Sequence, residues 1–318
     1  MLPQKRIKWW ISTAKKVLRR PDLLWVRLWY NTRRTTADIL YIFGINRYRY
    51  RIVFLAGMAL GATTWIKNLF ARVPGYYTRP DPMPEDIRYN QDICDSAFSR
   101  TPKMGNTLFK THLNPTQENV DCIFRNDVEK VIVSYRDLRD VAISRYHRLV
   151  NIPKDKSDPN YVDYEAVGKE AAIDHSIDII KEYYEPWILG WMEIGRKYPD
   201  RVLFVKFEDL KADTKGTFKR MLAFYEIGLP EGKIDDIIKQ AKGKKSLKQN
   251  IHASKVLPFA VSSNFRKGGS GYWKTELTER QIQRCKELLG ESLIALGYEK
   301  DLNWSGAPLT EKYSGEQH

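Results

Sequence analysis

A run of small residues at positions 57–64 has the composition of a phosphate-binding loop. Residues 51–56, RIVFLA, are apolar and strand-forming, and residues 65–73 space their apolar side chains as a helix does. A loop that leads from a strand into a helix presents backbone N–H groups and the positive end of the helix dipole to a phosphate. Gly61 is followed by Ala62 and Thr63, so the loop lacks the Gly-Lys-Ser/Thr signature of nucleoside triphosphatases. We therefore expect an anion site of another kind.

His112, in the segment KTHL at positions 110–113, is the best candidate for acid–base chemistry. A histidine has a pKa near neutrality, so it takes and returns protons at physiological pH. An isolated histidine is more often structural, and its sequence context must decide its role. The remaining histidines lack a comparable context and are predicted to be surface or structural residues: His147, His175, His252 and His318.

Four blocks of sequence, between about residue 50 and residue 300, resemble the cytosolic-type sulfotransferases in order and interval. GMALGATTW resembles the family's 5′-phosphosulfate loop, Pro-Lys/Arg-Ser-Gly-Thr-Thr-Trp, and matches it at residues 63–65. The family's Lys-Thr-His occurs at 110–112, and its arginine with a serine eight positions later occurs as Arg136 and Ser144. Its Arg-Lys-Gly and Gly-x-Trp-Lys block occurs at 266–274. Because the four blocks occur together, we interpret each as functional.

The resemblance implies a site for 3′-phosphoadenosine 5′-phosphosulfate (PAPS). The loop backbone and the hydroxyls of Thr63 and Thr64 would hold the 5′-phosphate, and Trp65 would stack on adenine. Arg136, Ser144 and the block at 266–268 would hold the 3′-phosphate, which distinguishes PAPS from ATP. The cofactor-binding positions implied in this way are Leu60, Gly61, Ala62, Thr63, Thr64, Trp65, Arg136, Ser144, Phe207, Arg266, Lys267 and Gly268.

The same resemblance implies a PAPS-dependent sulfotransferase that needs no metal and releases PAP. His112 would be the general base that takes the proton of an acceptor hydroxyl or amine, and Lys110 would supply positive charge nearby. Sulfuryl transfer moves a charged group in line between two oxygens, so catalysis is largely positioning and neutralisation of charge on the leaving phosphate.

The loop departs from the family pattern at residues 59–62, where Ala, Leu, Gly and Ala replace Pro, Lys or Arg, Ser and Gly. The family's basic residue at the position of Leu60 stabilises the leaving group, and loss of one such group commonly costs about 10² to 10³ in rate. Phe207 stands where the family often has a tyrosine. The cations that would compensate for Leu60 are Lys67, Lys110 and Lys274.

The sequence also bears on three other functions. The departures in the loop favour a catalytically impaired protein that binds PAP or PAPS, whereas the retained His112 favours an enzyme. A nucleotide kinase is disfavoured by the missing Gly-Lys and by the lack of a clear magnesium-binding aspartate after a strand. Nucleic-acid binding is disfavoured because no recognised nucleic-acid module occurs.

Alternating strands and helices predict the fold. Apolar strands are expected at 128–135 and 201–210, each followed by a helical pattern, in addition to the strand at 51–56. This alternation predicts an α/β fold with a parallel central sheet flanked by helices, the P-loop-like fold of the resembled family. Residues 74–119 are expected to be irregular. Thr278 and Gln281 are expected to form a capping box that begins a helix, which Gly297 would end.

Composition adds limits on partners and location. The chain has 318 residues with 53 Lys and Arg against 39 Asp and Glu, a net charge of +14 that favours anionic partners. The three cysteines are far apart, so neither a metal site nor a disulfide framework is indicated, and a reducing compartment is favoured. The chain contains no run of about 18 apolar residues, so no membrane-spanning segment is predicted. A cytoplasmic location follows, with peripheral attachment to a membrane as an alternative.

The chain is divided by sequence into an N-terminal extension at 1–48, a sulfotransferase domain at 49–300 and a tail at 301–318. The extension is basic, aromatic and amphipathic, and it would either lie on an acidic membrane or pack on the domain. The sequence is compatible with a small-molecule, a lipid or a saccharide acceptor. It indicates no particular oligomeric state. The segment at 151–161 is expected to be a mobile surface loop.

Overall fold

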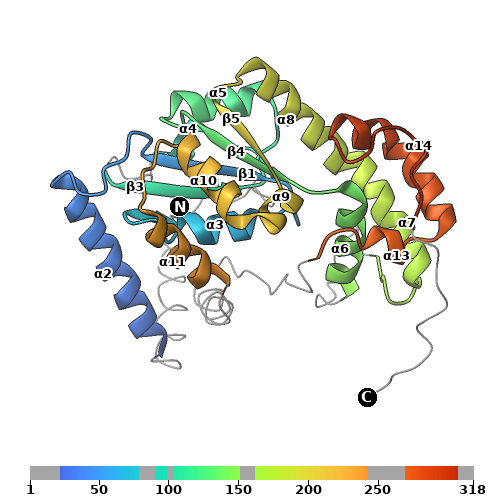
Figure 1. Cartoon of the computed structure of the whole chain (residues 1–318), viewed down its shortest axis with the longest axis horizontal. Coiled ribbons are helices and arrows are strands. Elements are labelled where there is room, and N and C mark those ends of the chain that lie inside the picture. The colour runs from blue at the N-terminus through green and yellow to red at the C-terminus, as the bar shows by residue number, and fades with distance from the viewer. Residues whose placement is uncertain (1–21, 79–90, 99–103, 151–161, 243–268, 307–318) are drawn as a thin grey trace, which may run out of the picture.

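A five-stranded parallel sheet forms the centre of the molecule, which is seen here in a computed structural model (Figure 1). The structure describes residues 22–78, 91–98, 104–150, 162–242 and 269–306. The strands lie in the order β2-β3-β1-β4-β5. Their bounds are β1 (Ile52–Gly57), β2 (Tyr76–Thr78), β3 (Asn106–Thr111), β4 (Val131–Tyr135) and β5 (Val202–Lys206). The parallel sheet that the sequence predicts is therefore confirmed.

Helices cover both faces of this sheet. On one face Ile52, Phe54 and Ala56 of β1 join a core with side chains of α5 (Gln117–Arg125), α6 (Leu138–Val150), α7 (Lys169–Ile179), α8 (Glu185–Lys197) and α14 (Glu279–Ala295). On the other face Val53 and Leu55 join a core with side chains of α3 (Thr63–Phe70), α10 (Thr214–Phe224) and α11 (Glu231–Lys242). Alternate residues of a strand point to opposite faces, which explains why β1 is apolar at every position.

The remaining elements are short or lie outside the two helical layers. They are α2 (Asp22–Ile42), α4 (Asp95–Phe98), the π-helical turn η1 (Ile180–Tyr184), α9 (Phe207–Ala212) and α13 (Trp273–Glu276). Helix α2 stands beside the sheet, apart from the other helices (Figure 1). Among the described helices, none has the length and apolar character needed to cross a membrane.

The strand register brings the predicted functional segments to one edge of the sheet. Gly57 at the end of β1 lies beside Ser134 of β4, and Ala56 lies beside Thr111 of β3. On the far side of β4, Tyr135 pairs with Lys206 of β5. Because parallel strands all end at this carboxyl edge, the loop after β1, His112, Arg136 and Phe207 come together there. Ligands of open α/β sheets bind at such an edge.

The expectation of irregular structure at 74–119 is wrong, because this segment contains β2, β3, α4 and the start of α5. Strand β3 reads NTLFKT, and its Asn106, Thr107 and Thr111 are buried although they are polar. Its backbone pairs with β1 on one side and β2 on the other, so pairing fixes it as a strand without an apolar run. Local pattern alone did not reveal this strand.

One further boundary differs from the prediction, and the predicted ends of α14 are confirmed. The third predicted strand ends at Lys206, and residues 207–212 form α9. Glu208 and Asp209 fall in the first turn of α9, where the helix dipole favours acidic side chains. At α14, Thr278 and Gln281 form the predicted capping box, and Gly297 has the left-handed φ of 69° expected at the helix end.

Candidate functional site

The loop between β1 and α3 is a tight turn held against β4. The Gly61 amide donates to the Met58 carbonyl at 3.0 Å, and the Met58 amide donates to Ser134 of β4 at 2.8 Å. A Cβ at Gly61 would lie 3.0 Å from the Met58 carbonyl oxygen and 3.3 Å from the Tyr135 Cα. A side chain at position 61 would therefore crowd the Met58 carbonyl and β4, which glycine avoids.

Thr63 and Thr64 begin α3 and differ in their surroundings. The Thr63 hydroxyl is buried and lies 3.3 Å from the Met58 carbonyl oxygen and 3.2 Å from the Ser134 hydroxyl. Thr64 is partly exposed, and Ala62 at the N-cap offers no side-chain oxygen to the first N–H groups of the helix. An uncapped helix N-terminus is an anion-binding arrangement. The predicted contacts of both threonines with a 5′-phosphate remain a prediction.

Two loop residues that are not glycine adopt left-handed backbone conformations, Leu60 with φ 68° and Ala62 with φ 69°. In the resembled family a glycine stands at the position of Ala62. A residue with a Cβ is strained by about 1 kcal/mol in this region. Replacing Ala62 by glycine is therefore expected to raise the free energy of unfolding by about 1 kcal/mol, measured by urea denaturation.

The matched control for this substitution is Ala223→Gly. Ala223 is exposed in the last turn of α10, where glycine is a weaker helix former than alanine and should lower stability by a fraction of about 1 kcal/mol. The two alanine-to-glycine changes should therefore shift stability in opposite directions. Equal destabilisation by both would show that Ala62 is not strained.

His112 follows directly after β3 and is oriented by the backbone of the loop strand. Its Nδ1 lies 2.5 Å from the carbonyl oxygen of Gly57. A carbonyl accepts only, so Nδ1 carries the proton and Nε2 is left as a proton acceptor. Burial, followed by the charges of Lys110 and Arg148, lowers the pKa of His112 to about 4. The ring is therefore neutral at pH 7, in the form that a general base requires.

This lowered pKa makes stability depend on pH. Below pH 6.5 an unfolded chain protonates His112 while the folded chain does not, until the pH approaches 4. The contribution of His112 to stability is thus lost as pH falls from about 6.5 to about 4 and then levels off. Between pH 7 and pH 5, His112 should account for a loss of free energy of unfolding on the order of 2 kcal/mol. Urea unfolding at the two pH values should show that this part of the loss is absent in His112→Asn.

Lys110 lies two residues before His112, within β3. Its Cα pairs with Leu55 of β1, and its side chain shares a face of the sheet with Leu108, which packs in the core under α3. The side chain is partly buried, and its charge contributes to lowering the pKa of His112. The structure thus places a cation on the α3 side of the sheet and a neutral imidazole at the end of the same strand.

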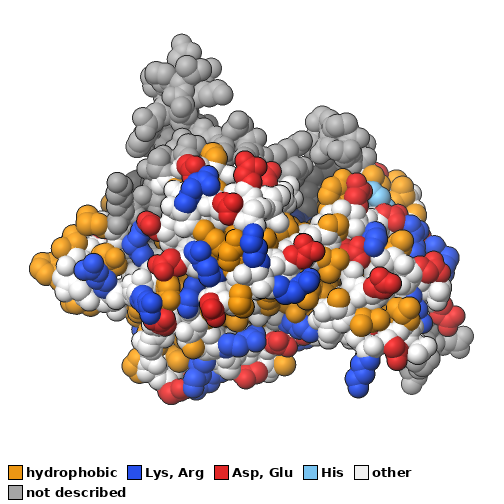
Figure 2. All heavy atoms as spheres, turned by 90° about the horizontal axis from the view of Figure 1, so that it is seen from above, with side chains coloured by type: hydrophobic (Ala, Val, Ile, Leu, Met, Phe, Trp, Pro, Cys, Tyr) orange, Lys and Arg blue, Asp and Glu red, His pale blue; other side chains and the backbone are white. Residues whose placement is uncertain are grey.

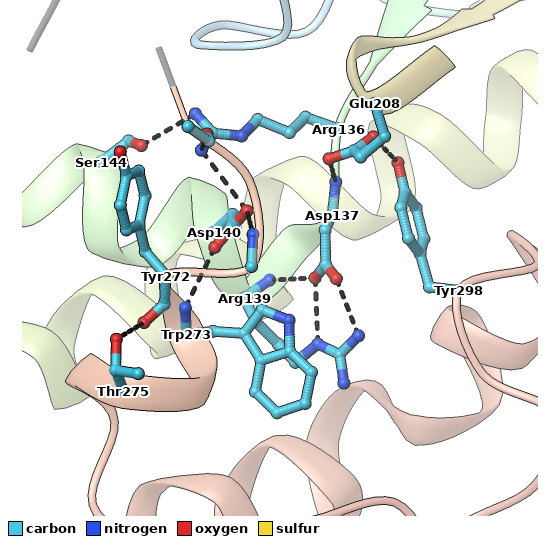
Figure 3. A network of polar contacts seen from close by, with 12 residues as sticks. Arg136, Asp137, Arg139, Asp140, Ser144, Glu208, Tyr272, Trp273, Thr275 and Tyr298 are labelled. Carbon is cyan, nitrogen blue, oxygen red and sulfur yellow. Dashed lines mark hydrogen bonds and ion pairs between the residues drawn. The ribbon is translucent and has the colours of Figure 1, made fainter. Parts of the chain in front are cut away.

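Arg136 is buried where β4 ends and gathers several predicted residues around it (Figure 3). Its guanidinium donates to the Ser144 hydroxyl at 2.9 Å and to the Gly269 carbonyl at 2.9 Å. The guanidinium carbon lies 4.6 Å from the centre of the Phe207 ring. Within the described part of the chain, its buried Nε has no hydrogen-bond partner. The predicted arginine and serine therefore do form one unit, and that unit retains an unused donor.

The aromatic side of this unit includes Trp65. The Trp65 and Phe207 rings lie 6.5 Å apart at an interplanar angle of 67°, an edge-to-face contact. Phe207 thereby connects the helix after the loop to Arg136. The structure brings together two predicted nucleotide contacts that are separated by 142 positions in the chain.

Asp140 is a positioning residue for which the sequence suggested no role. One carboxylate oxygen accepts from the Gly271 amide at 2.7 Å, and the other accepts from the Trp273 amide at 3.1 Å (Figure 3). The carboxylate also lies 3.4 Å from the Arg136 guanidinium. Burial raises the pKa of Asp140, while Arg136 and the two amides oppose that rise. Asp140 therefore ties the start of the described C-terminal segment to the arginine that is predicted to hold a phosphate.

Arg139 forms a second connection between α6 and the C-terminal segment. It is 1% exposed and pairs with Asp137 at 2.7 Å and with Glu299 at 2.6 Å. Its guanidinium carbon lies 3.6 Å from the centre of the Trp273 ring and 4.4 Å from that of Trp304. A buried arginine needs this degree of pairing, and removing one partner would be strongly destabilising.

Other predicted residues take structural positions or fall outside the description. His147 lies 2.8 Å from a Glu276 carboxylate oxygen, and His175 lies 2.7 Å from the Tyr164 hydroxyl, as expected of structural histidines. No three His, Cys, Asp or Glu side chains of the described residues are grouped so as to hold a metal ion. The predicted residues outside the described ranges are Arg266, Lys267, Gly268, His252 and His318, together with the segment at 151–161.

Comparison with known proteins finds sulfotransferases among the similar proteins. Flavonol 3-sulfotransferase of Flaveria bidentis is 30% identical over 278 residues, which cover 77% of this chain and 82% of the relative. The amine sulfotransferase of Oryctolagus cuniculus is 24% identical over 295 residues, covering 86% of this chain and 92% of the relative. Among solved structures, mouse sulfotransferase SULT7A1 complexed with PAP matches with a TM-score of 0.57 at 20% identity, covering 77% of this chain and 85% of that one.

The family model described as the sulfotransferase domain matches residues 51–297. This match begins at the strand that leads into the loop and ends at the glycine after α14. It includes all four blocks on which the resemblance was based. The chain therefore belongs to the sulfotransferase family.

Proposed function

We propose that this protein transfers a sulfuryl group from PAPS to a hydroxyl group of a small-molecule acceptor, with His112 as the general base. The observation that carries the proposal is the buried unit of Arg136 and Ser144 beside Phe207 and Trp65, at the same sheet edge as the loop. A buried cation with an unused donor suits an additional phosphate. The names of the relatives support small-molecule acceptors, since they include a flavonol and an amine sulfotransferase.

The described residues fit PAPS in two respects. The uncapped N-terminus of α3 offers backbone N–H groups for a 5′-phosphate, and the Arg136–Ser144 unit offers charge and donors for a 3′-phosphate. When bound, PAPS supplies the sulfuryl group, whose bond to the 5′-phosphate oxygen breaks as the acceptor oxygen bonds to sulfur, leaving PAP. Nε2 of His112 takes the acceptor's proton, and Lys110 supplies positive charge beside it.

The charges near His112 favour a hydroxyl over an amine acceptor. The charged groups that act on its pKa are Lys110 and Arg148, both cationic. A hydroxyl that becomes more negative as it loses its proton is stabilised by such surroundings, whereas a protonated amine is repelled. We therefore place phenols and other acidic hydroxyls ahead of amines, and lipid or saccharide hydroxyls as further candidates.

A second candidate function is binding of PAP or PAPS without efficient transfer. Leu60 occupies the position of the family's basic residue, and its side chain is partly buried against the core on the α6 side of the sheet. An apolar side chain there gives the leaving phosphate no charge stabilisation. The tautomer and orientation of His112 favour the enzyme over this alternative.

Calorimetry with PAP and with adenosine 5′-phosphate tests the shared premise of both functions. PAP should bind more tightly, because adenosine 5′-phosphate lacks the 3′-phosphate assigned to Arg136. Arg136→Gln should weaken PAP by roughly 30- to 100-fold and leave adenosine 5′-phosphate nearly unchanged, since a hydrogen bond to a charged group contributes about 2 to 3 kcal/mol. Arg284→Gln, which alters an ion pair between α14 and α7, is the matched control.

The outcomes separate the candidates. Absence of PAP binding by the folded chain would reject both functions, and tighter binding of ATP with magnesium would indicate a kinase. The chain could bind PAP and yet form no PAP from PAPS with any member of a panel of phenols, sterols, saccharides and amines. That result would favour the second candidate, a protein that binds the nucleotide without efficient transfer. Mass spectrometry of the panel would identify the acceptor class.

A further inference from the structure

The end of α2 and the turn after it expose a cluster of large apolar side chains, called here the α2 tip patch. Its members are Ile39, Ile42, Phe43 and Ile45, with exposed fractions of 48%, 60%, 76% and 50%. Ile39, Ile42 and Phe43 are spaced three and four residues apart and so share one face of the helix. Figure 2 shows hydrophobic and basic side chains side by side at this end of the molecule. Exposed clusters of this kind mark interaction surfaces.

The patch is held rigidly by the way α2 ends. The Ile45 amide donates to the Leu40 carbonyl at 2.8 Å and the Gly44 amide to the Tyr41 carbonyl at 3.0 Å. This pair of bonds is a Schellman motif, and Gly44 supplies the left-handed φ of 79° that it requires. The apolar side chains are therefore presented by a defined turn rather than by a fraying helix end.

The turn after α2 is also attached to the amino edge of the sheet. The Asn106 side chain, at the start of β3, donates to the Asn46 carbonyl at 2.7 Å. The Tyr48 ring stacks on the Tyr76 ring of β2 at 5.2 Å, and its hydroxyl donates to the Pro74 carbonyl at 3.0 Å. The patch thus moves with the domain, and any surface that it binds is oriented relative to the active-site edge.

The positive charge of the N-terminal segment indicates what kind of surface the α2 tip patch binds. Residues 1–48 contain eleven Lys and Arg against two Asp, so this segment carries +9 of the net +14 in less than a sixth of the chain. Arg33 and Arg47 are exposed within the described part of it, and Asp38 is paired with Arg34 at 3.8 Å. A second copy of the chain on the patch would bring two such segments together, and their repulsion disfavours that dimer.

We propose that the α2 tip patch inserts into the interface of an anionic membrane, with Arg47, two residues after Ile45, against the lipid headgroups. An apolar patch beside an arginine in a basic segment has the composition that binds such surfaces, because burial of the apolar side chains and attraction of the charges add. The proposal does not depend on the sulfotransferase activity. It concerns described residues at the opposite edge of the sheet from the loop and His112.

The placement of the patch has a consequence for the acceptor. β3 runs from Asn106, beside the patch, to Thr111, beside His112, and six residues of strand span about 17 Å. A membrane bound at the amino edge therefore leaves the carboxyl edge open to water. Docking by this patch anchors the enzyme without presenting membrane lipid to the active site, which favours a water-soluble acceptor.

Sedimentation of the full chain with vesicles tests the proposal. Phosphatidylcholine vesicles containing phosphatidylserine should bind the protein, pure phosphatidylcholine vesicles should bind it much less, and raising the salt from about 0.1 M to about 0.5 M should weaken binding by screening. Ile42→Ser with Phe43→Ser should lower the partition coefficient at least about tenfold. Arg47→Gln should lower it about fivefold.

The matched control is Val167→Ser with Leu302→Ser, since these side chains are 47% and 48% exposed outside the patch. This variant should bind as the unaltered chain does, and all variants should keep the unaltered melting temperature. Wild-type binding by the Ile42→Ser, Phe43→Ser variant would overturn the proposal, because the basic N-terminal residues alone would then account for it. Light scattering that finds a dimer lost in this variant, without vesicle binding by the unaltered chain, would assign the patch to self-association.

Discussion

Leu60→Lys is expected to raise the rate of sulfuryl transfer by about 10² to 10³. The position lies in the turn between β1 and α3, at the edge of the sheet where His112 and Arg136 also lie. An ammonium group there would stabilise the negative charge that develops on the leaving phosphate, which leucine cannot do. The measurement is PAP formation from PAPS with a phenol acceptor, as kcat.

The control for this substitution is Leu60→Met. Methionine has an unbranched, uncharged side chain close in length to that of lysine, and it shares with lysine the strain of a φ of 68°. A gain in rate by the lysine variant alone therefore reports the charge. Equal rates in the two variants would contradict the prediction and would indicate that a cation already in place, such as Lys110, serves the leaving group.

A rate gain would also decide between the two proposed functions. If the unaltered chain shows no turnover with any acceptor and the lysine variant does, the natural protein is a PAP-binding sulfotransferase homologue with impaired chemistry. Measurable turnover in the unaltered chain would show an active enzyme that works with reduced stabilisation of the leaving group. Both outcomes retain the assignment of the nucleotide site, which depends on Arg136 and the loop backbone.

The parallel sheet and the loop could be predicted from patterns in the residues, and the Arg136–Ser144 pair from the resemblance to the sulfotransferases. β1 is apolar throughout and is followed at once by small residues, whereas an arginine eight positions before a serine carries a signal only through the spacing of the family. β3 could not be predicted in this way. Its buried polar residues are stabilised by pairing with β1 and β2, and the sequence of β3 alone does not contain that information.

The ionic connections at the start of α6 were missed for a related reason. Asp140 and Arg139 are charged residues in a helix of mixed composition, and such residues are usually solvated. Besides the nearby Asp137 and Arg136, their partners are the backbone at 271–273 and Glu299, more than 130 positions later. The available signal was weak: an aspartate between the two predicted phosphate contacts, in a chain with a large basic excess. Only the structure shows that Asp140 is buried and that its carboxylate contacts both Arg136 and the backbone at 271–273.

His112→Asn is expected to lower kcat by about 10² to 10⁴ and to leave PAP affinity unchanged. The asparagine amide nitrogen can take the place of Nδ1 and keep the hydrogen bond to the Gly57 carbonyl. Nε2, the proposed proton acceptor, is lost. The substitution therefore removes the base and preserves the contact that holds the end of β3 to β1.

The matched control is His147→Asn, which alters a histidine that pairs with Glu276 and has no proposed part in the reaction. It should leave kcat nearly unchanged. If the role of His112 is only the hydrogen bond that asparagine can replace, the asparagine variant should keep its rate, and any loss of rate should come with a loss of PAP affinity and stability. A loss confined to kcat, largest for acceptors with the least acidic hydroxyls, is what a general base requires, because those acceptors depend most on proton removal.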